Sequence, residues 1–302
     1  MSKTALAILV SDIHLSDKPP IFRSSEPDWF EAMKRPLDQL QYFANKFDCP
    51  IVCGGDVFDK WNSSPELINF AIDNLPMMYS VAGQHDLPHH RYSAIERSAY
   101  WTLCKTGNII NLNENEPIEI KNGLMLHGFG WNVDLAPMLS GDLCFHLAVV
   151  HRYIWAGAAT SYSDAPETNH VNHLSKKLKG FQAALFGDNH KGFMTTTKDG
   201  LTIFNHGGFM RRTRDQINYK PKVGILFSDG TIERKELNCS EDKTLVVEND
   251  TSTRTEIDFE NFVVELEKLG SDSLDFRKSI LSYCENQNIE KEVHSLIMEL
   301  MS

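Results

Sequence analysis

Five short segments of the sequence hold a disproportionate share of its aspartates and histidines. They are Asp12-Ile-His14, Gly54-Gly-Asp56-Val-Phe-Asp59, Gly83-Gln84-His85-Asp86, His151 and Gly187-Asp188-Asn189-His190. Imidazole and carboxylate groups bind transition metals such as manganese, iron or zinc, and such sites can keep positions open for water. An aspartate that lies between two such groups can bridge two ions about 3.5–4 Å apart. The residue types therefore point to a metal site that can activate water.

Each of these segments directly follows an apolar run that is typical of a buried strand. The runs are Ala5–Val10, Pro50–Cys53, Met77–Ala82, Cys144–Val150 and Ala183–Phe186. Between them, a capping box at Asp28–Glu31 predicts a helix to about Phe47, and Ser64-Pro65 predicts the start of another. Because α/β sheets place their ligands at the carboxyl ends of strands, we expect the five segments to meet at one edge.

Each segment taken alone also has a purely structural interpretation. Gly-Gly-Asp and Gly-Asp-Asn-His are typical of turns, where glycine and aspartate supply the required backbone angles. His151 alone fits a buried core histidine. Five such segments, each at a strand end, favour the metal site over five separate turns.

The set of motifs resembles the calcineurin-like metallophosphoesterase superfamily, whose pattern is D-x-H, G-D, G-N-H-D, H and G-H-x-H. The resemblance covers about residues 5–210. It implies an α/β (α+β) fold in which two mixed sheets form a sandwich flanked by helices. It also implies a phosphoesterase site with two divalent metal ions.

The resemblance assigns a role to each motif residue. Asp12, His14, Asp56 and His190 would bind the first ion, with Asp56 bridging, and Gln84, His151 and Asp188 would complete the second. His85 would be the catalytic imidazole, oriented by a hydrogen bond to Asp86. A water activated by the ions would attack phosphorus in line while His85 assists departure of the leaving group.

Two ligand positions depart from the superfamily pattern. Gln84 stands where the pattern has asparagine, and Asp188 stands where it has histidine. Both changes fall on the second ion and supply oxygen donors, which favour manganese or magnesium over softer ions. We therefore expect manganese first, with magnesium, iron or zinc as alternatives. A non-catalytic interaction protein with a degraded second site is the extreme alternative.

Within the superfamily, the chain resembles the SbcD-type double-strand-break-repair nucleases. Gly54–Asp59 is similar to their G-G-D-L-F segment, and Asn205–Thr213 is similar to their Asn-Pro-Gly-Ser…Arg-Thr segment, with His206 and Gly208 replacing Pro and Ser. This implies a DNA exo- or endonuclease in repair, recombination or phage genome processing, working with a coiled-coil, SMC-like ATPase. A small-molecule nucleotide phosphodiesterase or phosphatase is the alternative enzyme.

Charge is distributed unevenly along the chain, whose net charge is -11. Residues 176–222 carry ten lysines and arginines against three aspartates, which fits a polyanionic substrate. Within that stretch, Arg211, Arg212 and Arg214 are the candidates for contact with substrate phosphate. Residues 231–302 hold 8 basic against 17 acidic residues. This acidic segment could bind the ATPase through an amphipathic helix or pack on its own core.

The pattern along the chain predicts three regions. Residues 1–220 would form the catalytic domain, 221–240 a small hairpin or cap-like segment, and 241–302 a linker followed by an acidic helical tail. A homodimer is a further expectation. No apolar run approaches the roughly 20 residues that span a bilayer, and no leader peptide opens the sequence, so we expect a cytoplasmic protein without membrane contact. No Cys-x-x-Cys pair occurs among the six cysteines, which argues against a structural zinc site.

Overall fold

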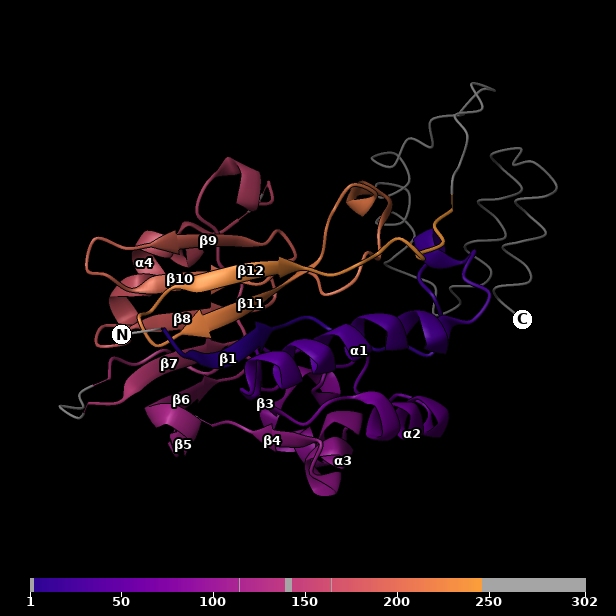
Figure 1. Ribbon diagram of the computed structural model, residues 1–302, viewed down its shortest axis with the longest axis horizontal. Coiled ribbons are helices and arrows are strands. Elements are labelled where there is room, and N and C mark those ends of the chain that lie inside the picture. Colours follow the sequence, from indigo (N-terminus) through magenta and orange to yellow (C-terminus); the bar gives the residue numbers. More distant parts are fainter. Residues whose placement is uncertain (1–2, 114, 139–142, 164, 246–302) are drawn as a thin grey trace, which may run out of the picture. The chain divides into compact units, whose positions relative to one another are not determined.

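The computed structural model describes residues 3–113, 115–138, 143–163 and 165–245 (Figure 1). In these residues two six-stranded sheets form a sandwich, with helices on its outer faces. The predicted two-sheet α/β sandwich is confirmed. The predicted linker beyond residue 245 and the helical tail lie outside the described residues, and they stay predictions.

The first sheet has the strand order β12-β11-β1-β2-β3-β4. Four of its strands are parallel to one another: β1 (Ala5–Val10), β2 (Ile51–Cys53), β3 (Met78–Ser80) and β4 (Ile109–Asn111). The hairpin of β11 (Lys222–Phe227) and β12 (Ile232–Glu236) adds two antiparallel strands, because β11 pairs with the other edge of β1.

The second sheet has the order β5-β6-β7-β8-β10-β9. Its central strands are parallel: β6 (Leu124–Phe129), β7 (Phe145–Val150), β8 (Ala183–Phe186) and β10 (Thr202–Asn205). Antiparallel strands close its two edges, namely β5 (Ile118–Ile120) and β9 (Phe193–Thr196). The carboxyl ends of β7 and β8 therefore lie at the same edge of this sheet.

Four helices connect and cover the sheets in the described residues: α1 (Trp29–Phe47), α2 (Pro65–Asn74), α3 (Ala99–Thr106) and α4 (Val171–Lys177). The predicted helix starts are confirmed, since Asp28 accepts a hydrogen bond from the Glu31 amide and Ser64 accepts one from the Leu67 amide. Short 3-10 turns occur at Ile21–Arg23, Pro88–His90, Tyr92–Arg97, Lys121–Gly123, Ala158–Thr160, Glu167–Asn169 and Arg214–Gln216. Figure 1 shows α1, α2 and α3 grouped beside the first sheet.

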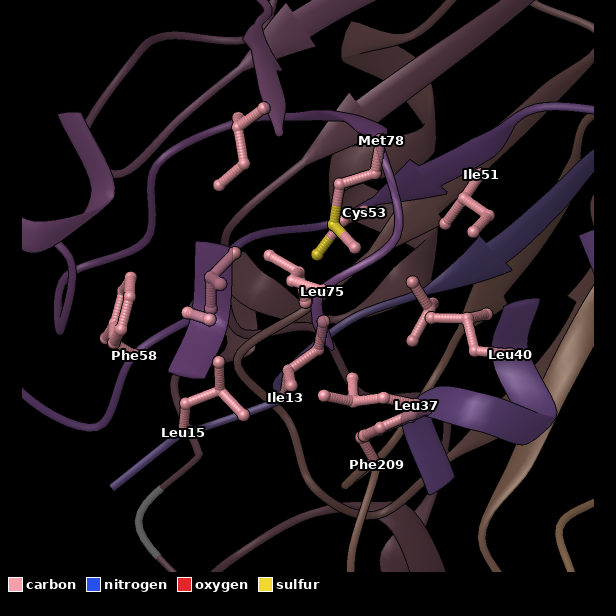
Figure 2. Packing of buried hydrophobic residues seen from close by; sticks show 14 of the residues in the cluster. Ile13, Leu15, Leu37, Leu40, Ile51, Cys53, Phe58, Leu75, Met78 and Phe209 are labelled. Atoms are coloured by element: carbon pink, nitrogen blue, oxygen red, sulfur yellow. The ribbon is translucent and has the colours of Figure 1, made fainter. Parts of the chain in front are cut away.

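Alternation of side chains along β1 explains the layers. Ile8 and Val10 belong to the cluster that contacts α1, α2 and α3, whereas Leu9 belongs to the cluster between the two sheets. An irregularity in the pairing of β1 between Ala5 and Ala7 places Leu6 in the cluster between the sheets as well. Figure 2 shows part of the helix-side cluster, including Leu37 of α1. Burying a leucine completely stabilises a fold by about 1.5–3 kcal/mol. These contacts hold the strand ends, and hence the loops after them, in fixed positions.

The hairpin is part of the first sheet and is not a separate cap-like segment. The compact unit that contains the hairpin spans Met1–Val246. The physical reason is that β1, buried on both faces, needs a hydrogen-bonding partner on each edge. β2 supplies one partner and β11 supplies the other. Among the described helices, none combines the length and apolar character needed to cross a bilayer.

Candidate metal centre

The loops after five strands bring histidine and aspartate side chains together. In the described part of the chain, three sets of potential ligand atoms each lie within 4.8 Å of one another. The sets are Asp12, His14 and His190; Asp12, Asp56 and His151; and His14, Asp59 and His85. The predicted residues from segments as far apart as 12 and 190 thus converge on one place, with Asp12 and His14 each shared between two sets.

The backbone at this centre adopts conformations that favour glycine, although the residues are not glycine. Positive φ angles occur at Asp12 (54°), His14 (51°), Asp56 (52°) and Asp188 (73°). Each such residue costs on the order of 1–3 kcal/mol unless the surroundings hold it in place. Here they do, because the Asp12 amide donates to the Gly55 carbonyl (3.0 Å) and the His14 amide donates to the Asp56 carbonyl (3.0 Å). The loops after β1 and β2 therefore fix each other.

Two glycines make room for ligand side chains. A Cβ at Gly83 would lie 2.1 Å from Oδ1 of Asp56, and one at Gly55 would lie 2.5 Å from Nδ1 of His151. Gly55 also has a φ of 99°. Larger residues at either position would displace a candidate ligand. The glycines quoted in the motifs therefore serve the packing of the centre as well as its turns.

His151 faces a group of acceptors. Its Nδ1 lies 2.6 Å from the Gly54 carbonyl, so that nitrogen must donate. Its Nε2 lies 2.7 Å from Oε1 of Gln84 and 3.3 Å from Oδ2 of Asp56. Burial alone would lower the pKa of His151, but the carboxylates of Asp56, Asp12 and Asp188 outweigh it and raise the pKa to about 10. A positive charge, from a proton or a metal ion, is favoured at this point.

The pair formed by His14 and His190 also fits a metal ion. Their Nε2 atoms lie 3.1 Å apart, and Oδ1 of Asp12 is 3.9 Å and 3.7 Å from them. Burial lowers the pKa of His14 to about 4, so its ring is neutral at neutral pH. Two buried atoms here have no hydrogen-bond partner in the structure, namely Nδ1 of His14 and Oδ2 of Asp56. A divalent ion would satisfy the lone pairs that face one another, so these residues fit the two ions that the motifs imply.

The two residues that depart from the superfamily pattern lie in this centre and contact each other. Nε2 of Gln84 donates to Oδ1 of Asp188 (2.8 Å), while Oε1 of Gln84 faces His151. The Asp188 amide donates to Oδ1 of Asp12 (3.0 Å). Burial raises the pKa of the Asp188 carboxyl, with Asp12 and Asp56 adding to the effect. Gln84, His151 and Asp188 thus form one group on the side of the centre where the second ion was predicted.

His85 lies at the centre, but its partner is not the predicted one. Its Nδ1 is 2.8 Å from the backbone carbonyl of Asp59, and its ring meets that of His14 edge to face at 5.0 Å. Because a carbonyl only accepts, Nδ1 carries a proton and Nε2 is left as the reactive nitrogen. Asp59 belongs to the motif Gly54–Asp59, but no role was predicted for it. Its position three residues after Asp56 was the sequence feature that could have indicated its place at the centre.

The predicted hydrogen bond from Asp86 to His85 is wrong. Asp86 is fully buried and accepts from the backbone amides of Val57 (3.3 Å), Phe58 (3.0 Å) and Gly83 (3.0 Å). Burial, reinforced by the charge of Asp56, raises the pKa of Asp86 to about 7. Asp86 therefore fastens the loop after β2 to the loop after β3 and does not touch the imidazole.

The three predicted phosphate-contacting arginines have different surroundings. Arg212 lies at the centre, where it donates to the His14 carbonyl (2.6 Å) and to Oδ1 of Asp59 (2.7 Å). Arg214 is exposed on a 3-10 turn. Arg211 instead donates to Asp242 and to the carbonyls of Ile217 and Cys239. Its guanidinium is engaged in a cluster of ion pairs and hydrogen bonds, and the phosphate contact predicted for Arg211 stays a prediction.

The chain is similar in sequence to one family of proteins and in structure to several solved proteins. A family model described as calcineurin-like phosphoesterase matches residues 7–192. No curated protein matches the chain. Among solved structures, TT1561 of Thermus thermophilus is similar at 10% identity and a TM-score of 0.47, covering 78% of this chain and 100% of that one. The calcineurin-like phosphoesterase YfkN of Bacillus subtilis is similar at 14% identity and a TM-score of 0.39, covering 78% and 89%.

Proposed function

Because the chain belongs to the calcineurin-like phosphoesterase family, we propose that it is a metal-dependent phosphodiesterase whose substrate is DNA. The observation that carries this proposal is the position of Asp56. Its Oδ2 has no hydrogen-bond partner and lies 3.9 Å from Nε2 of His14 and 3.3 Å from Nε2 of His151. The carboxylate is thus placed between the two halves of the centre, as a bridging ligand would be.

The ligand assignment follows from the neighbours. Asp12, His14, Asp56 and His190 would hold one ion, and Asp56, Gln84, His151 and Asp188 would hold the other. When bound, two divalent ions lower the pKa of water and offset charge on phosphate oxygens. We propose manganese as the preferred ion, because Gln84 and Asp188 supply oxygen donors on the second side.

His85 would act on the leaving group. The Asp59 carbonyl holds the proton on Nδ1, which fixes the direction in which Nε2 points. A protonated Nε2 can donate to the oxygen that departs from phosphorus, and this shortens the lifetime of charge on that oxygen. Arg212 adds a positive charge beside the same ring, because its guanidinium is bonded to Asp59.

DNA is the proposed substrate because of the segment that carries Arg212. This segment, Asn205–Thr213, resembles the repair nucleases in sequence, and its Arg212 reaches back to the backbone of His14. An arginine held in this way can bind phosphate while it positions a ligand loop. An ATPase partner that binds residues 246–302 is the further part of this proposal, and it concerns residues outside the described ranges.

The test is incubation of the full chain with labelled single-stranded and double-stranded DNA under manganese, magnesium and no metal. We expect cleavage only with metal, and fastest with manganese. His85→Ala should lower the rate by about 10²–10⁴-fold, the usual contribution of a general acid or base. Its metal content should stay that of the wild type, since His85 is not among the proposed ligands.

The matched control is Tyr42→Ala, a change at an exposed position on α1. This variant should cleave DNA at the wild-type rate. Intact DNA of every form, with both ions bound, would refute the nuclease proposal. Rapid hydrolysis of a nucleotide diester under the same conditions would then assign the centre to small molecules.

A further inference from the structure

An exposed aromatic side chain lies beside the metal centre, in the loop that follows His151. We propose that Tyr162 stacks on an unpaired nucleobase of the substrate whose phosphate is bound at the centre, with Lys191 and Arg214 attracting the flanking phosphates. The inference rests on the proposed function and deepens it. It names nucleotides with an accessible base, such as single-stranded DNA ends, as the substrate class.

Tyr162 presents its side chain to solvent from a fixed position. The residue is 49% exposed. Its backbone amide donates to the hydroxyl of Tyr153 (3.0 Å), and the two rings lie 5.9 Å apart. The contact that fixes this part of the loop uses the backbone of Tyr162 and leaves much of its side chain available to a ligand.

A lysine from the other side of the centre reaches the same tyrosine. Nζ of Lys191 lies 4.3 Å from the centroid of the Tyr162 ring and donates to the Ser161 carbonyl (2.7 Å). Lys191 directly follows His190, a candidate ligand. The ammonium lies over one face of the ring, where it supplies a counter-charge for phosphate, and the base would stack on the other face.

The loop is tied to the metal ligands through Asn189. This residue is fully buried between Asp188 and His190 in the sequence, and its Nδ2 donates to the carbonyls of Ile154 (2.6 Å) and Thr160 (2.8 Å). The turn that carries two candidate ligands therefore also holds the loop that carries Tyr162. A base stacked on Tyr162 would be held at a defined distance from the scissile phosphate.

The contacts of Lys191 and Asn189 join the loop of Tyr162 to the turn that carries the candidate ligands, and the charges around the tyrosine agree with that position. Burial raises the pKa of Tyr162, and Tyr153 and the carboxylates of Asp215, Asp188 and Asp12 raise it further. The negative charges of Asp188 and Asp12, two residues of the metal centre, thus act on the Tyr162 hydroxyl. Asp215 belongs to the turn Arg214–Gln216, whose Arg214 is exposed.

A nucleobase fits this surface better than other phosphate esters do. Every base has a flat π face, and stacking on tyrosine needs no particular sequence. In a duplex both faces of an internal base are covered by its neighbours, so only unpaired or terminal bases can use the ring. A phosphomonoester without an aromatic group would gain nothing from Tyr162.

The test compares two oligonucleotides of one length, one with normal bases and one with stable tetrahydrofuran residues in place of the nucleosides. We expect the wild-type chain to cleave the base-bearing strand with about tenfold higher kcat/KM, a typical effect of stacking one base on an aromatic ring. Tyr162→Ala should remove that preference, whereas Tyr162→Phe should keep it because the ring remains. Tyr42→Ala serves as the control, and its preference should equal that of the wild type.

If the wild type cleaves both strands at the same rate, and Tyr162→Ala does so too, the inference is overturned and the nuclease proposal stands. A second measurement covers the opposite case, in which the chain does not cleave DNA. Full-length protein loaded with manganese is titrated with deoxyadenosine monophosphate and with deoxyribose 5-phosphate, which lacks the base. If no DNA is cleaved but the nucleotide still binds about tenfold more tightly in a Tyr162-dependent way, the inference holds and the nuclease proposal fails. Equal binding of both compounds would overturn the inference on its own.

Discussion

Two buried polar clusters in this molecule differ in how well their charges are paired. The metal centre gathers Asp12, Asp56 and Asp188 among histidines and leaves buried lone pairs without hydrogen bonds. The second cluster gathers three arginines and two carboxylates: Arg23, Glu26, Arg35, Arg211 and Asp242. In it each carboxylate accepts from at least two arginines.

This difference distinguishes a metal-binding site from a cluster of charges that only stabilises the fold. In the arginine cluster, Glu26 also accepts from the Lys243 amide (2.8 Å), and Arg23 donates to the Arg211 carbonyl (3.1 Å). Such a cluster requires no further ion to balance its charges. The metal centre carries an excess of negative charge and facing acceptors, so it requires cations. Burial is common to both, and the completeness of pairing separates them.

The largest expected effect concerns Asp56, the carboxylate that we propose as the bridging ligand. Asp56→Asn should lower hydrolysis by at least about 10²–10³-fold, the range seen when one electrostatic group is lost from a reaction centre. Metal bound per chain, measured by mass spectrometry, should fall as well. The matched variant is Asp242→Asn, which removes a carboxylate from the arginine cluster. Full metal content in Asp56→Asn, or its loss in Asp242→Asn, would break the comparison.

The next effect concerns stability and falls on the arginine cluster. Glu26→Gln leaves Arg23, whose side chain is 1% exposed, with one carboxylate partner fewer. Removing one member of a buried ion pair costs about 3 kcal/mol or more, so the free energy of unfolding in urea should fall by that amount. Lys34→Gln, which breaks the exposed pair with Asp38, should leave the midpoint unchanged. Metal content should be normal in both variants, and a loss of bound metal in Glu26→Gln would contradict the separation of the two clusters.

Removal of metal should have a somewhat smaller effect on stability. Ions that bind only the native chain stabilise it by about 2.7 kcal/mol at one hundred times their dissociation constant. A chelator should therefore lower Tm by several degrees in the wild type, and added manganese should restore it. In Asp56→Asn the chelator should change Tm much less. An identical response of both proteins would mean that the ions bind elsewhere.

The smallest expected effect is a pH dependence that belongs to Glu26. Burial would raise its pKa, but hydrogen bonds from Arg23, the Lys243 amide and Arg35 outweigh burial and lower the pKa below the ordinary value of 4.5. The stabilisation is therefore present above the unfolded pKa and is lost as pH falls through the folded pKa. Unfolding free energies are measured with chelator from pH 7 to pH 3, and the difference between the wild type and Glu26→Gln should become smaller on the acid side. A difference in unfolding free energy that does not change with pH would contradict the assignment of this pH dependence to Glu26.

The fold could be predicted where one physical signal dominates. Strands buried on both faces are continuous apolar runs, so Ala5–Val10 and Ala183–Phe186 were predicted with the bounds that the structure gives. The convergence of Asp12, Asp56 and His151 followed from their positions after such strands. These features depend on local sequence and on one rule of sheet geometry.

The rest depends on contacts that spacing does not reveal. Asp86 and His85 are neighbours in sequence, but their side chains take different partners because the loop backbone directs them apart. Likewise, Arg212 lies at the metal centre while Arg211 bonds to Asp242, a residue about thirty positions later. A run of arginines predicts a basic segment, but it does not predict which of them meets a carboxylate.

The pairing of β1 with β11 bears on how the protein is made. The partner of β1, Lys222–Phe227, emerges from the ribosome more than two hundred residues after β1 itself. At a synthesis rate of roughly 5–20 residues per second, the edge of β1 that pairs with β11 stays uncovered for on the order of ten seconds or longer. An uncovered strand edge is a template for aggregation, so the nascent chain depends on shielding during that interval. The loop with Asp12 and His14 follows that strand, so the support that β11 gives to this loop arrives only after translation has passed the hairpin.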